Sequence, residues 1–187
     1  METLRLSGSR SITWFCFHSG RTLPDGEESW EESDLIKIRE VIESDLSKIH
    51  AIETDVYPTS WSTSFFNMMF LLKDNMFIVA TEKDELVGYC VGEVKKMGKT
   101  GKPILIGHVL NVAVSRQNQH KGIGSLLLNE MEDRFMEKDA EISYLEVRES
   151  NAIAQTVYKK RGYQYVRTSK GYYGNEDGFI MMKTLTR

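Results

Sequence analysis

Residues 119–124 read QHKGIG, and the two glycines stand at the start of a strongly helical stretch. The first N–H groups of a helix have no partner within it, and the helix dipole adds partial positive charge there. Gly122 and Gly124 have no Cβ atom, so the oxygens of an anion can approach the backbone closely. The pattern therefore indicates a phosphate or pyrophosphate site, made mainly of main-chain donors from His120 to Ser125.

Two other interpretations of the glycines stay open on this evidence. The turn could simply start a core helix. It could also belong to a dinucleotide site, with Glu146 about 20 residues further on as the ribose-binding acid. However, Leu127 replaces the third glycine, and seven residues separate Val114 from Gly122, whereas a dinucleotide turn follows its strand directly. The Walker pattern GxxxxGK[ST] is also absent, so nicotinamide binding is disfavoured.

The spacing of apolar residues places the glycine motif within a regular order of elements. Strands are expected at 36–41, 76–81, 86–94, 104–114, 142–149, 163–173 and 177–185. Helices are expected at 45–56, 64–73, 122–139 and 151–162. The turn at 82–85 makes a hairpin, and the strand–helix–strand run from 104 to 149 makes a crossover. This order predicts an α/β fold with a mixed, mostly antiparallel sheet and helices on both faces.

Local signals refine the predicted helices. Ser44 can cap the first of them, and Gly162 can end the last. Spacing of four residues predicts a buried stripe on the helix after the glycine motif, formed by Ile123, Leu127, Met131 and Phe135.

Composition narrows the class of protein. The chain has 187 residues, of which 41% are apolar and 27% charged, as is typical of a soluble globular protein. Its net charge of −3 argues against direct binding of nucleic acid through a basic face. No apolar run approaches the roughly 20 residues that a membrane helix needs, so no contact with a membrane is expected.

The N-terminal part of the chain differs from the rest. Residues 1–35 are expected to form an extension of unknown order, with a possible strand in SITWFCF at 11–17 and an acidic linker after it. SITWFCF is too short for a membrane helix, and no small-residue cleavage site follows it. Cys16 and Cys90 have no CxxC partner, which favours reduced thiols in a cytoplasmic protein. Residues 36–187 are expected to form one domain.

The sequence around the glycines resembles the GNAT superfamily of acetyl-CoA-dependent N-acetyltransferases. The matching pieces are NVAV at 111–114, the [QR]-x-x-G-x-[GA] signature at 119–124, and LEVRESNAIAQTVYKKRGY at 145–163. The last piece, together with KGYYGNEDGFIMMKTL at 170–185, is similar to the RimI and Ard types, which acetylate protein N-termini. The resemblance covers 36–187 and implies the GNAT fold, with acetyl-CoA as the cofactor.

The resemblance also implies which residues bind the cofactor. The pyrophosphate of CoA would lie on the signature loop, and its pantetheine arm would pair with the preceding strand where that strand splays from the next one. Asn151, which its position predicts as a helix N-cap, would contact the cofactor as well. Tyr158 would contact it too, as the general acid that protonates the departing thiolate. The loop and strand residues are Gln119, His120, Lys121, Gly122, Ile123, Gly124 and Ser125, and Val112, Ala113 and Val114.

The attacking amine must lose a proton, and two residues are candidates for the general base. Glu146 aligns with the carboxylate proposed as the base in RimI types. It could instead form an ion pair with a neighbour such as Arg148. His108 lies in GHVLNVAV, which resembles an Ard-type strand, and an imidazole titrates in the useful range. A lone histidine could also be purely structural.

The substrate peptide would be held by residues in two loops. By resemblance these are Tyr57, Pro58, Tyr172 and Tyr173. The Ard pattern has a glutamate directly after this proline, whereas this chain has Thr59, so substrate preference does not transfer.

The expected activity is acetylation of the α-amine of a protein or peptide N-terminus by direct attack in a ternary complex, without a metal. An auxiliary subunit or the ribosome could present the substrate. Two alternatives stay open, an acetyltransferase for lysine side chains or small amines, and a non-catalytic module that binds acyl-CoA.

Overall fold

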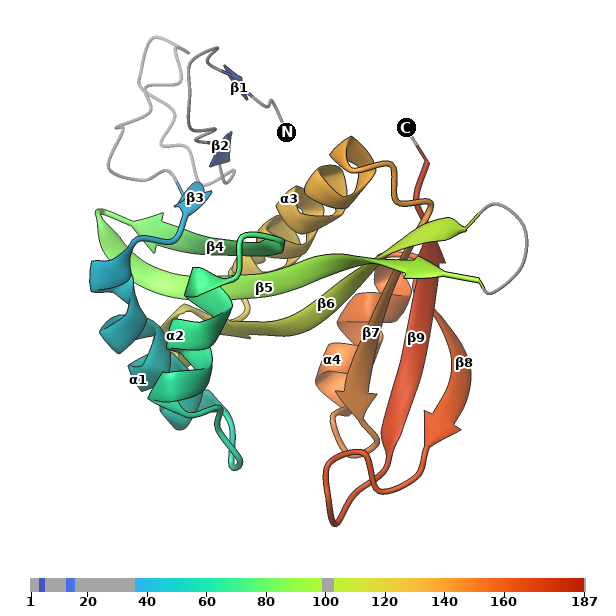
Figure 1. Ribbon diagram of the computed structural model, residues 1–187. Helices are drawn as coiled ribbons and strands as arrows, with labels where there is room; N and C mark the ends of the chain where they lie inside the picture. The colour runs from blue at the N-terminus through green and yellow to red at the C-terminus, as the bar shows by residue number, and fades with distance from the viewer. Residues whose placement is uncertain (1–3, 6–12, 16–35, 99–102, 187) are drawn as a thin grey trace, which may run out of the picture. The chain divides into compact units, whose positions relative to one another are not determined.

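The computed structural model describes residues 4–5, 13–15, 36–98 and 103–186 (Figure 1). The strands are β1 (Leu4–Arg5), β2 (Thr13–Phe15), β3 (Ile36–Glu40), β4 (Asn75–Glu82), β5 (Glu85–Met97), β6 (Ile104–Val114), β7 (Ile142–Arg148), β8 (Gln164–Ser169) and β9 (Gly178–Thr184). The helices are α1 (Leu46–Val56), α2 (Thr63–Leu71), α3 (Ile123–Glu137) and α4 (Ala152–Lys160), with 3-10 turns at Glu43–Asp45 and Arg116–Asn118. From β3 onward, this is the predicted order of elements.

The strands form one hydrogen-bonded sheet in the order β1-β2-β3-β4-β5-β6-β7-β9-β8. β3 pairs antiparallel with β4, and β9 pairs antiparallel with both β7 and β8. β6 and β7, which flank α3 in sequence, pair in parallel. This confirms the predicted mixed, mostly antiparallel sheet and the predicted crossover from β6 through α3 to β7. The predicted strand at 11–17 is confirmed for Thr13–Phe15, whereas Cys16 lies outside the described residues.

The chain divides into two compact units. The first contains residues 77–90, 112–130 and the described residues up to 73. The second contains residues 74–76, 91–111 and those from 131 onward. The boundary passes through strands and through α3.

In the first unit, helices cover both faces of β5. Neighbouring residues of a strand point to opposite faces. Tyr89 is fully buried and its ring centroid lies 5.5 Å from that of Phe66 in α2. At Gly88, a Cβ atom would lie 3.2 Å from a side-chain carbon of Leu127 in α3. α2 and α3 therefore pack on opposite faces of this strand, as predicted.

In the second unit, Phe135 of α3 packs directly on glycines. A Cβ atom at Gly107 in β6 would lie 2.1 Å from the ring, and one at Gly92 in β5 would lie 2.8 Å from it. The ring is fully buried. The predicted stripe of Ile123, Leu127, Met131 and Phe135 is buried along its whole length.

Two predicted details of the helix ends have different outcomes. Ser44 does not cap α1, because it lies within the 3-10 turn before that helix. In this turn the Asp45 carboxylate accepts the Ile42 N–H at 2.9 Å. It also accepts two hydrogen bonds from the Arg39 guanidinium, at 2.6 and 3.0 Å. A carboxylate held by a guanidinium is a stronger acceptor than a hydroxyl. Gly162 ends α4 with φ of +90°, as predicted.

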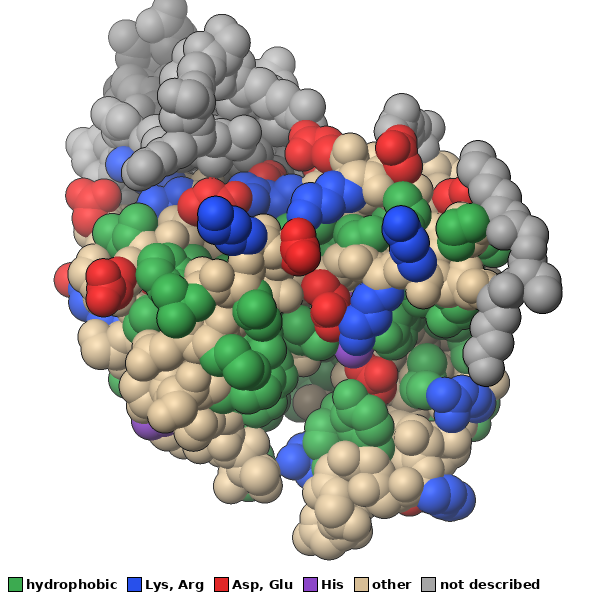
Figure 2. All heavy atoms as spheres, in the orientation of Figure 1, with side chains coloured by type: hydrophobic (Ala, Val, Ile, Leu, Met, Phe, Trp, Pro, Cys, Tyr) green, Lys and Arg blue, Asp and Glu red, His purple; other side chains and the backbone are tan. Residues whose placement is uncertain are grey.

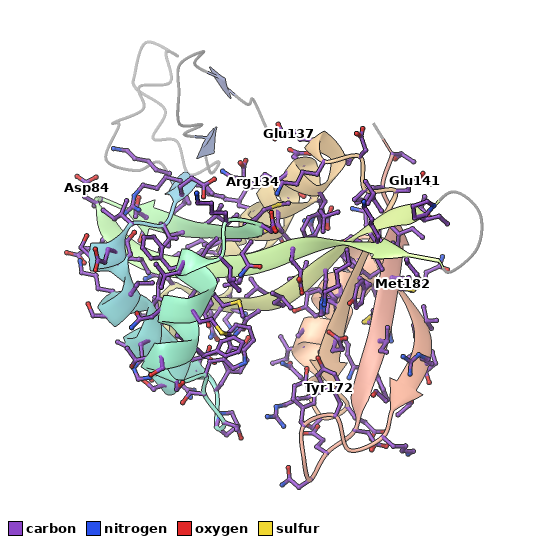
Figure 3. All side chains as sticks on the ribbon, viewed as in Figure 1. Asp84, Arg134, Glu137, Glu141, Tyr172 and Met182 are labelled. Atoms are coloured by element: carbon purple, nitrogen blue, oxygen red, sulfur yellow. The ribbon has the colours of Figure 1, made fainter. Side chains whose placement is uncertain are left out.

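The predicted strand at 163–173 is too long. β8 ends at Ser169, and Gly171 and Gly174 take φ values of +62° and +81°. The Asp177 carboxylate accepts the Gly171 N–H at 2.9 Å. Tyr172, labelled in Figure 3, and Tyr173 therefore lie in a turn between β8 and β9 rather than in a strand.

The outer side of α2 carries exposed apolar side chains, which appear as green patches in Figure 2. Leu71 is 75% exposed, Leu72 48% and Met68 44%. None of these belongs to the predicted site.

We predict that Gly107→Ala lowers the free energy of unfolding by about 1–3 kcal/mol, because the new methyl group overlaps the Phe135 ring. Urea denaturation followed by circular dichroism measures the change. In a Phe135→Leu background the same substitution should cost less, since Leu lacks the ring edge. An equal cost in both backgrounds would show that overlap with the ring is not the cause.

Candidate active site

The signature loop has the backbone geometry that its glycines predict. Gly122 has φ of +79° and His120 has φ of +64°. The N–H groups of Ser125 and Leu126 both donate to the Gly122 carbonyl, at 2.9 and 3.1 Å. Helical hydrogen bonding therefore begins at Gly122, and the N–H groups of Ile123 and Gly124 belong to the first turn, where a helix offers no partner.

Neighbouring side chains brace this loop within the first unit. Gln119 donates to the Val114 carbonyl at 3.1 Å, which ties the loop to the end of β6. Lys121 donates to the Asn118 side chain at 2.7 Å and forms an ion pair with Glu82 at 3.2 Å.

The loop fits the diphosphate of acetyl-CoA. A Cβ atom at Gly124 would meet only Val114, at an ordinary 3.7 Å, so the backbone at the helix start is open to a close approach. The Lys121 side chain is 46% exposed and adds a positive charge beside the first-turn donors.

The predicted substrate residue Tyr57 makes contact with the predicted cofactor strand. Its hydroxyl donates to the Val112 carbonyl at 2.5 Å. Tyr57 therefore uses its hydroxyl proton to hold the strand. Pro58, next in the chain, is exposed.

Glu53 of α1 holds the α1–α2 loop, although its role was not predicted. It is 1% exposed, and its carboxylate accepts the Trp61 N–H at 2.9 Å and the Tyr89 hydroxyl. Burial, and then the charge of Glu53, raises the pKa of Tyr89, which keeps the phenol a donor. An acid four residues after Ile49, on the apolar face of the helix, was the signal available in the sequence.

The parallel pairing of β6 and β7 stops before either strand ends. Pairs run from Ile106–Ile142 to Val109–Leu145, while β6 continues to Val114 and β7 to Arg148. No later β6–β7 pair occurs among the described residues. The parallel ladder therefore ends before the predicted cofactor residues Val112, Ala113 and Val114.

The two predicted base candidates lie together in the second unit. His108 Nε2 lies 2.7 Å from Glu146 Oε2, and both side chains are nearly buried. The Tyr144 ring stacks on the imidazole, with centroids 4.0 Å apart and planes 11° from parallel. The alternative partner for Glu146 is wrong, because Arg148 instead forms an ion pair with Glu176 at 3.0 Å.

The tyrosine pair of the β8–β9 turn faces the same carboxylate. Burial, then the charge of Glu146, raises the pKa of Tyr173 to about 12. The same two causes raise the pKa of Tyr172, which also hydrogen-bonds to Glu146. The Tyr144 phenol has its pKa raised to about 12, again by burial and then by Glu146. All three phenols stay protonated at neutral pH and can donate hydrogen bonds.

The residues that fix the tyrosine turn were also missed. The Glu176 carboxylate accepts the Ser150 N–H at 2.8 Å and pairs with Arg148, whose guanidinium lies 4.2 Å from the Tyr173 ring centroid. Asp177 holds the start of the turn through Gly171. The adjacent acids that follow the tyrosine pair were the signal for this arrangement.

Asn151 and Tyr158 lie on α4 as expected. Asn151 is the N-cap, because its side-chain oxygen accepts the Ala154 N–H at 3.0 Å. Tyr158 is half-buried, with its ring centroid 5.9 Å from that of Tyr163. The Tyr163 hydroxyl in turn bonds to Ser143 at 2.7 Å and to Glu132 at 3.0 Å, which anchors the end of α4 on buried polar groups.

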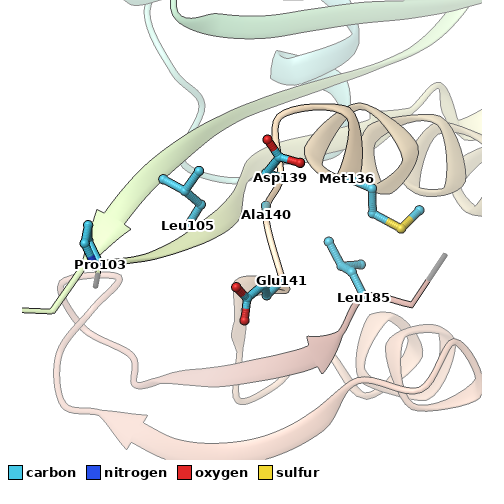
Figure 4. Close-up of a pocket in the computed structure, with 7 residues that line it drawn as sticks. All are labelled: Pro103, Leu105, Met136, Asp139, Ala140, Glu141 and Leu185. Atoms are coloured by element: carbon cyan, nitrogen blue, oxygen red, sulfur yellow. The ribbon is translucent and has the colours of Figure 1, made fainter. Parts of the chain in front are cut away.

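A separate hollow of about 510 Å³ lies in the second unit and contains none of the predicted site residues (Figure 4). Its lining residues are Pro103, Leu105, Met136, Asp139, Ala140, Glu141 and Leu185. Within the described ranges, no group of His, Cys, Asp and Glu side chains could hold a metal ion. In the same part of the chain, no helix combines the length and apolar character needed to cross a membrane.

Comparison with known proteins agrees with the fold and the motifs. Residues 46–163 match the model of the Acetyltransferase (GNAT) family. An N-alpha-acetyltransferase of Sulfurisphaera tokodaii is 33% identical over 80% of this chain and 93% of its own. The N-terminal acetyltransferase B complex catalytic subunit NAA20 of Arabidopsis thaliana is 31% identical over 82% of this chain and 87% of its own.

A solved structure shows the same fold. The ribosomal-protein-S18-alanine N-acetyltransferase of Escherichia coli superposes with a TM-score of 0.71 at 22% identity, over 81% of this chain and 95% of that one. The likeness to this structure therefore extends over the whole fold. The chain belongs to the acetyltransferase (GNAT) family and is an acyltransferase that uses acetyl-CoA.

Proposed function

We propose that this protein acetylates the α-amine at the N-terminus of a protein or peptide. The observation that carries the proposal is the His108–Glu146 pair with the tyrosine pair of the β8–β9 turn beside it. A carboxylate coupled to an imidazole can remove the proton of an ammonium group, and the nearby phenols can orient a peptide. The relatives named N-alpha-acetyltransferase and NAA20 support an α-amine as the acceptor.

Residues of the first unit would hold the acetyl donor. Bound acetyl-CoA supplies the acetyl group as a thioester. The first-turn N–H groups of Ile123 and Gly124, with Lys121, would bind its diphosphate. The main chain of Val112–Val114 offers donors and acceptors to the amide-rich arm, as an open strand edge does for a peptide.

Residues of the second unit would move the protons. Glu146, supported by His108, accepts a proton from the substrate ammonium at a carboxylate oxygen. The Tyr158 hydroxyl gives a proton to the departing sulfur, and Asn151 begins the helix that carries it. Direct attack is proposed, and the full burial of Cys90, the cysteine among the described residues, supports it, because a buried thiol is not placed to carry an acyl group.

The proposal also includes the binding partners of the protein, its cellular location and the bounds of its catalytic domain. An auxiliary protein subunit is favoured by the similarity to NAA20, which is named as part of a complex, and the ribosome is the other proposed source of N-termini. The cytoplasm is the proposed location, since Cys90 is a free thiol. Residues 36–187 are proposed to be the catalytic domain and 1–35 an extension of it.

The proposal predicts that peptides with a free N-terminus are acetylated at the α-amine and that the same peptides with a blocked N-terminus are not. Incubation with labelled acetyl-CoA and a library of N-terminal sequences, followed by mass spectrometry, locates the label. Acetylation of blocked peptides only would instead identify an acetyltransferase for lysine side chains or small amines. If the protein binds labelled acetyl-CoA but never transfers the label to a peptide, it is a non-catalytic module.

Tyr158→Phe should lower kcat by about 10²-fold, the usual loss when a general acid is removed. Its affinity for CoA should stay unchanged, because only one hydroxyl is lost. Steady-state kinetics and calorimetric titration with CoA measure the two quantities. Tyr165→Phe is the matched control, since among the described residues that hydroxyl bonds only to Thr168 on the exposed edge strand β8. An unchanged rate for Tyr158→Phe would reject its role as the acid.

Tyr57→Phe should weaken the binding of substrates rather than the proton transfers. It removes the hydrogen bond to the Val112 carbonyl, which is worth about 0.5–1.5 kcal/mol. We expect KM for acetyl-CoA to rise by roughly 2- to 10-fold, in line with that free energy, with little change in kcat. A lower kcat with unchanged KM would show that Tyr57 acts on the chemical step.

A further inference from the structure

The helix that carries Tyr158, α4, is not held by buried side chains of its own. All nine of its residues, Ala152–Lys160, are described, and none of them is buried. Its first turn is fixed by the Asn151 cap and by the Gln155 side chain, which donates to main-chain carbonyls just before the helix. The position of its last turn, which contains Tyr158, therefore depends strongly on contacts made by the residues that follow it.

Those residues tie the last turn of α4 to a buried carboxylate. The Tyr158 carbonyl accepts the N–H groups of Arg161 and Tyr163, both at 3.0 Å. The side chains of the same two residues reach Glu132 of α3, with the Arg161 guanidinium 3.1 Å and the Tyr163 hydroxyl 3.0 Å from Oε1. One carboxylate oxygen on α3 therefore holds the two residues that hold the backbone of Tyr158.

Glu132 is itself fixed in place. It is 4% exposed, and its other oxygen pairs with Lys183 of β9 at 2.6 Å. The Tyr163 hydroxyl donates to Glu132 and lies 2.7 Å from the Ser143 hydroxyl of β7. Burial, and then the charge of Glu132, raises the pKa of Tyr163, which keeps the phenol a donor. Side chains from α3, β7 and β9 therefore form one polar cluster at the end of α4.

The tie also passes through the aromatic rings. The Tyr158 and Tyr163 ring centroids are 5.9 Å apart, and both residues belong to the second unit, as does Glu132. Packed side chains transmit a displacement to their neighbours, because protein interiors are close-packed. A shift of Tyr163 would therefore move both the backbone and the ring of Tyr158.

We propose that Glu132 is a positioning residue that sets the place of the Tyr158 hydroxyl. It acts through Arg161 and Tyr163 and takes no part in proton transfer itself. The proposal rests on the proposed role of Tyr158 as the general acid. Misplacing a catalytic group by about 1 Å can cost up to roughly 10²-fold in rate, so a carboxylate on another helix can affect the chemical step strongly.

Two matched substitutions separate positioning from a general loss of stability. Arg161→Met and Lys183→Met each remove one cation from Glu132, keep an apolar stem and leave the other cation in place. Only Arg161 is attached to the end of α4. We expect kcat to fall about tenfold in Arg161→Met and to change by less than about twofold in Lys183→Met, with KM for acetyl-CoA nearly constant in both. Equal losses of kcat in the two variants would overturn the proposal.

A double-mutant cycle tests whether the effect passes through Tyr158. In a Tyr158→Phe background the acid is already absent, so Arg161→Met should lower kcat further by less than about twofold. A general loss of folded enzyme would lower kcat by the same factor in both backgrounds, which would contradict the proposal. If Arg161→Met does not fold, Tyr163→Phe replaces it, because it keeps the ring and removes the bond to Glu132. It too should lower kcat only when Tyr158 is present.

Hydrogen–deuterium exchange followed by mass spectrometry provides a readout without substrates. The N–H groups at 161 and 163 donate to the Tyr158 carbonyl, so their exchange reports how firmly the end of α4 is held. We expect peptides that cover 158–163 to exchange faster in Arg161→Met and at the unaltered rate in Lys183→Met. Unaltered exchange in Arg161→Met would show that the cluster does not hold the helix.

Failure of this proposal and failure of the proposed function give different results. The kinetic assays detect the free thiol of CoA, which is released whichever amine attacks, so an acceptor other than an α-amine leaves them valid. An unchanged rate in Tyr158→Phe would overturn the role of Tyr158, and the positioning proposal with it. Equal effects of Arg161→Met and Lys183→Met, with Tyr158→Phe impaired, would overturn only the role of Glu132.

Discussion

The packing of Phe135 against Gly107 and Gly92 determines where the polar residues of the second unit point. The ring occupies the space of the missing side chains, so the α3 side of β5 and β6 is closed at these positions. Side chains alternate along a strand. Glu93 and His108, which directly follow the two glycines, must therefore point to the opposite face, where Glu146 and Tyr144 also lie.

Carboxylates serve two different purposes in this chain, and their partners distinguish them. Glu53 and Glu176 accept main-chain N–H groups and hold a loop in place. Glu132 is buried but neutralised by Arg161 and Lys183. Among the ion pairs of the described residues, Glu146 takes part only in the one with His108. The carboxylate of Glu146, which faces an imidazole and phenols rather than a lysine or arginine, is thus set apart from the carboxylates that hold loops.

The sequence predicts correctly the residues whose roles follow from the pattern of the few residues around them. The glycine-edged helix start, the N-cap Asn151 and the spacing of the buried stripe on α3 follow from backbone physics over a few residues. The pairing of Glu146 with His108 depends on the parallel register of β6 and β7, which are separated by a whole helix, so a nearer residue, Arg148, was the obvious candidate partner.

Long-range contacts also explain what was missed. Glu53 and Tyr89 are 36 positions apart in the chain, and no local sequence pattern near either residue predicts their hydrogen bond. The over-long strand at 163–173 has a local cause instead. Alternation continues through YVRTS, and the strand ends where Gly171 takes a positive φ and donates its N–H to the Asp177 carboxylate six residues later. The turn that carries the tyrosine pair is therefore formed by contacts within itself, and Glu176 ties it to Ser150 and Arg148.

The absence of the Ard-type glutamate after Pro58 agrees with the positions of the charged and titratable side chains in the two units. The first unit holds the end of β6 with a neutral tyrosine hydroxyl, and its loop braces itself with Gln119 and Lys121. The titratable acids that could handle a proton are instead gathered around His108. These carboxylates and the imidazole are held in place by the sheet without a substrate. They therefore need little reorganisation during the reaction, which is the condition under which preorganised charges are most effective in catalysis.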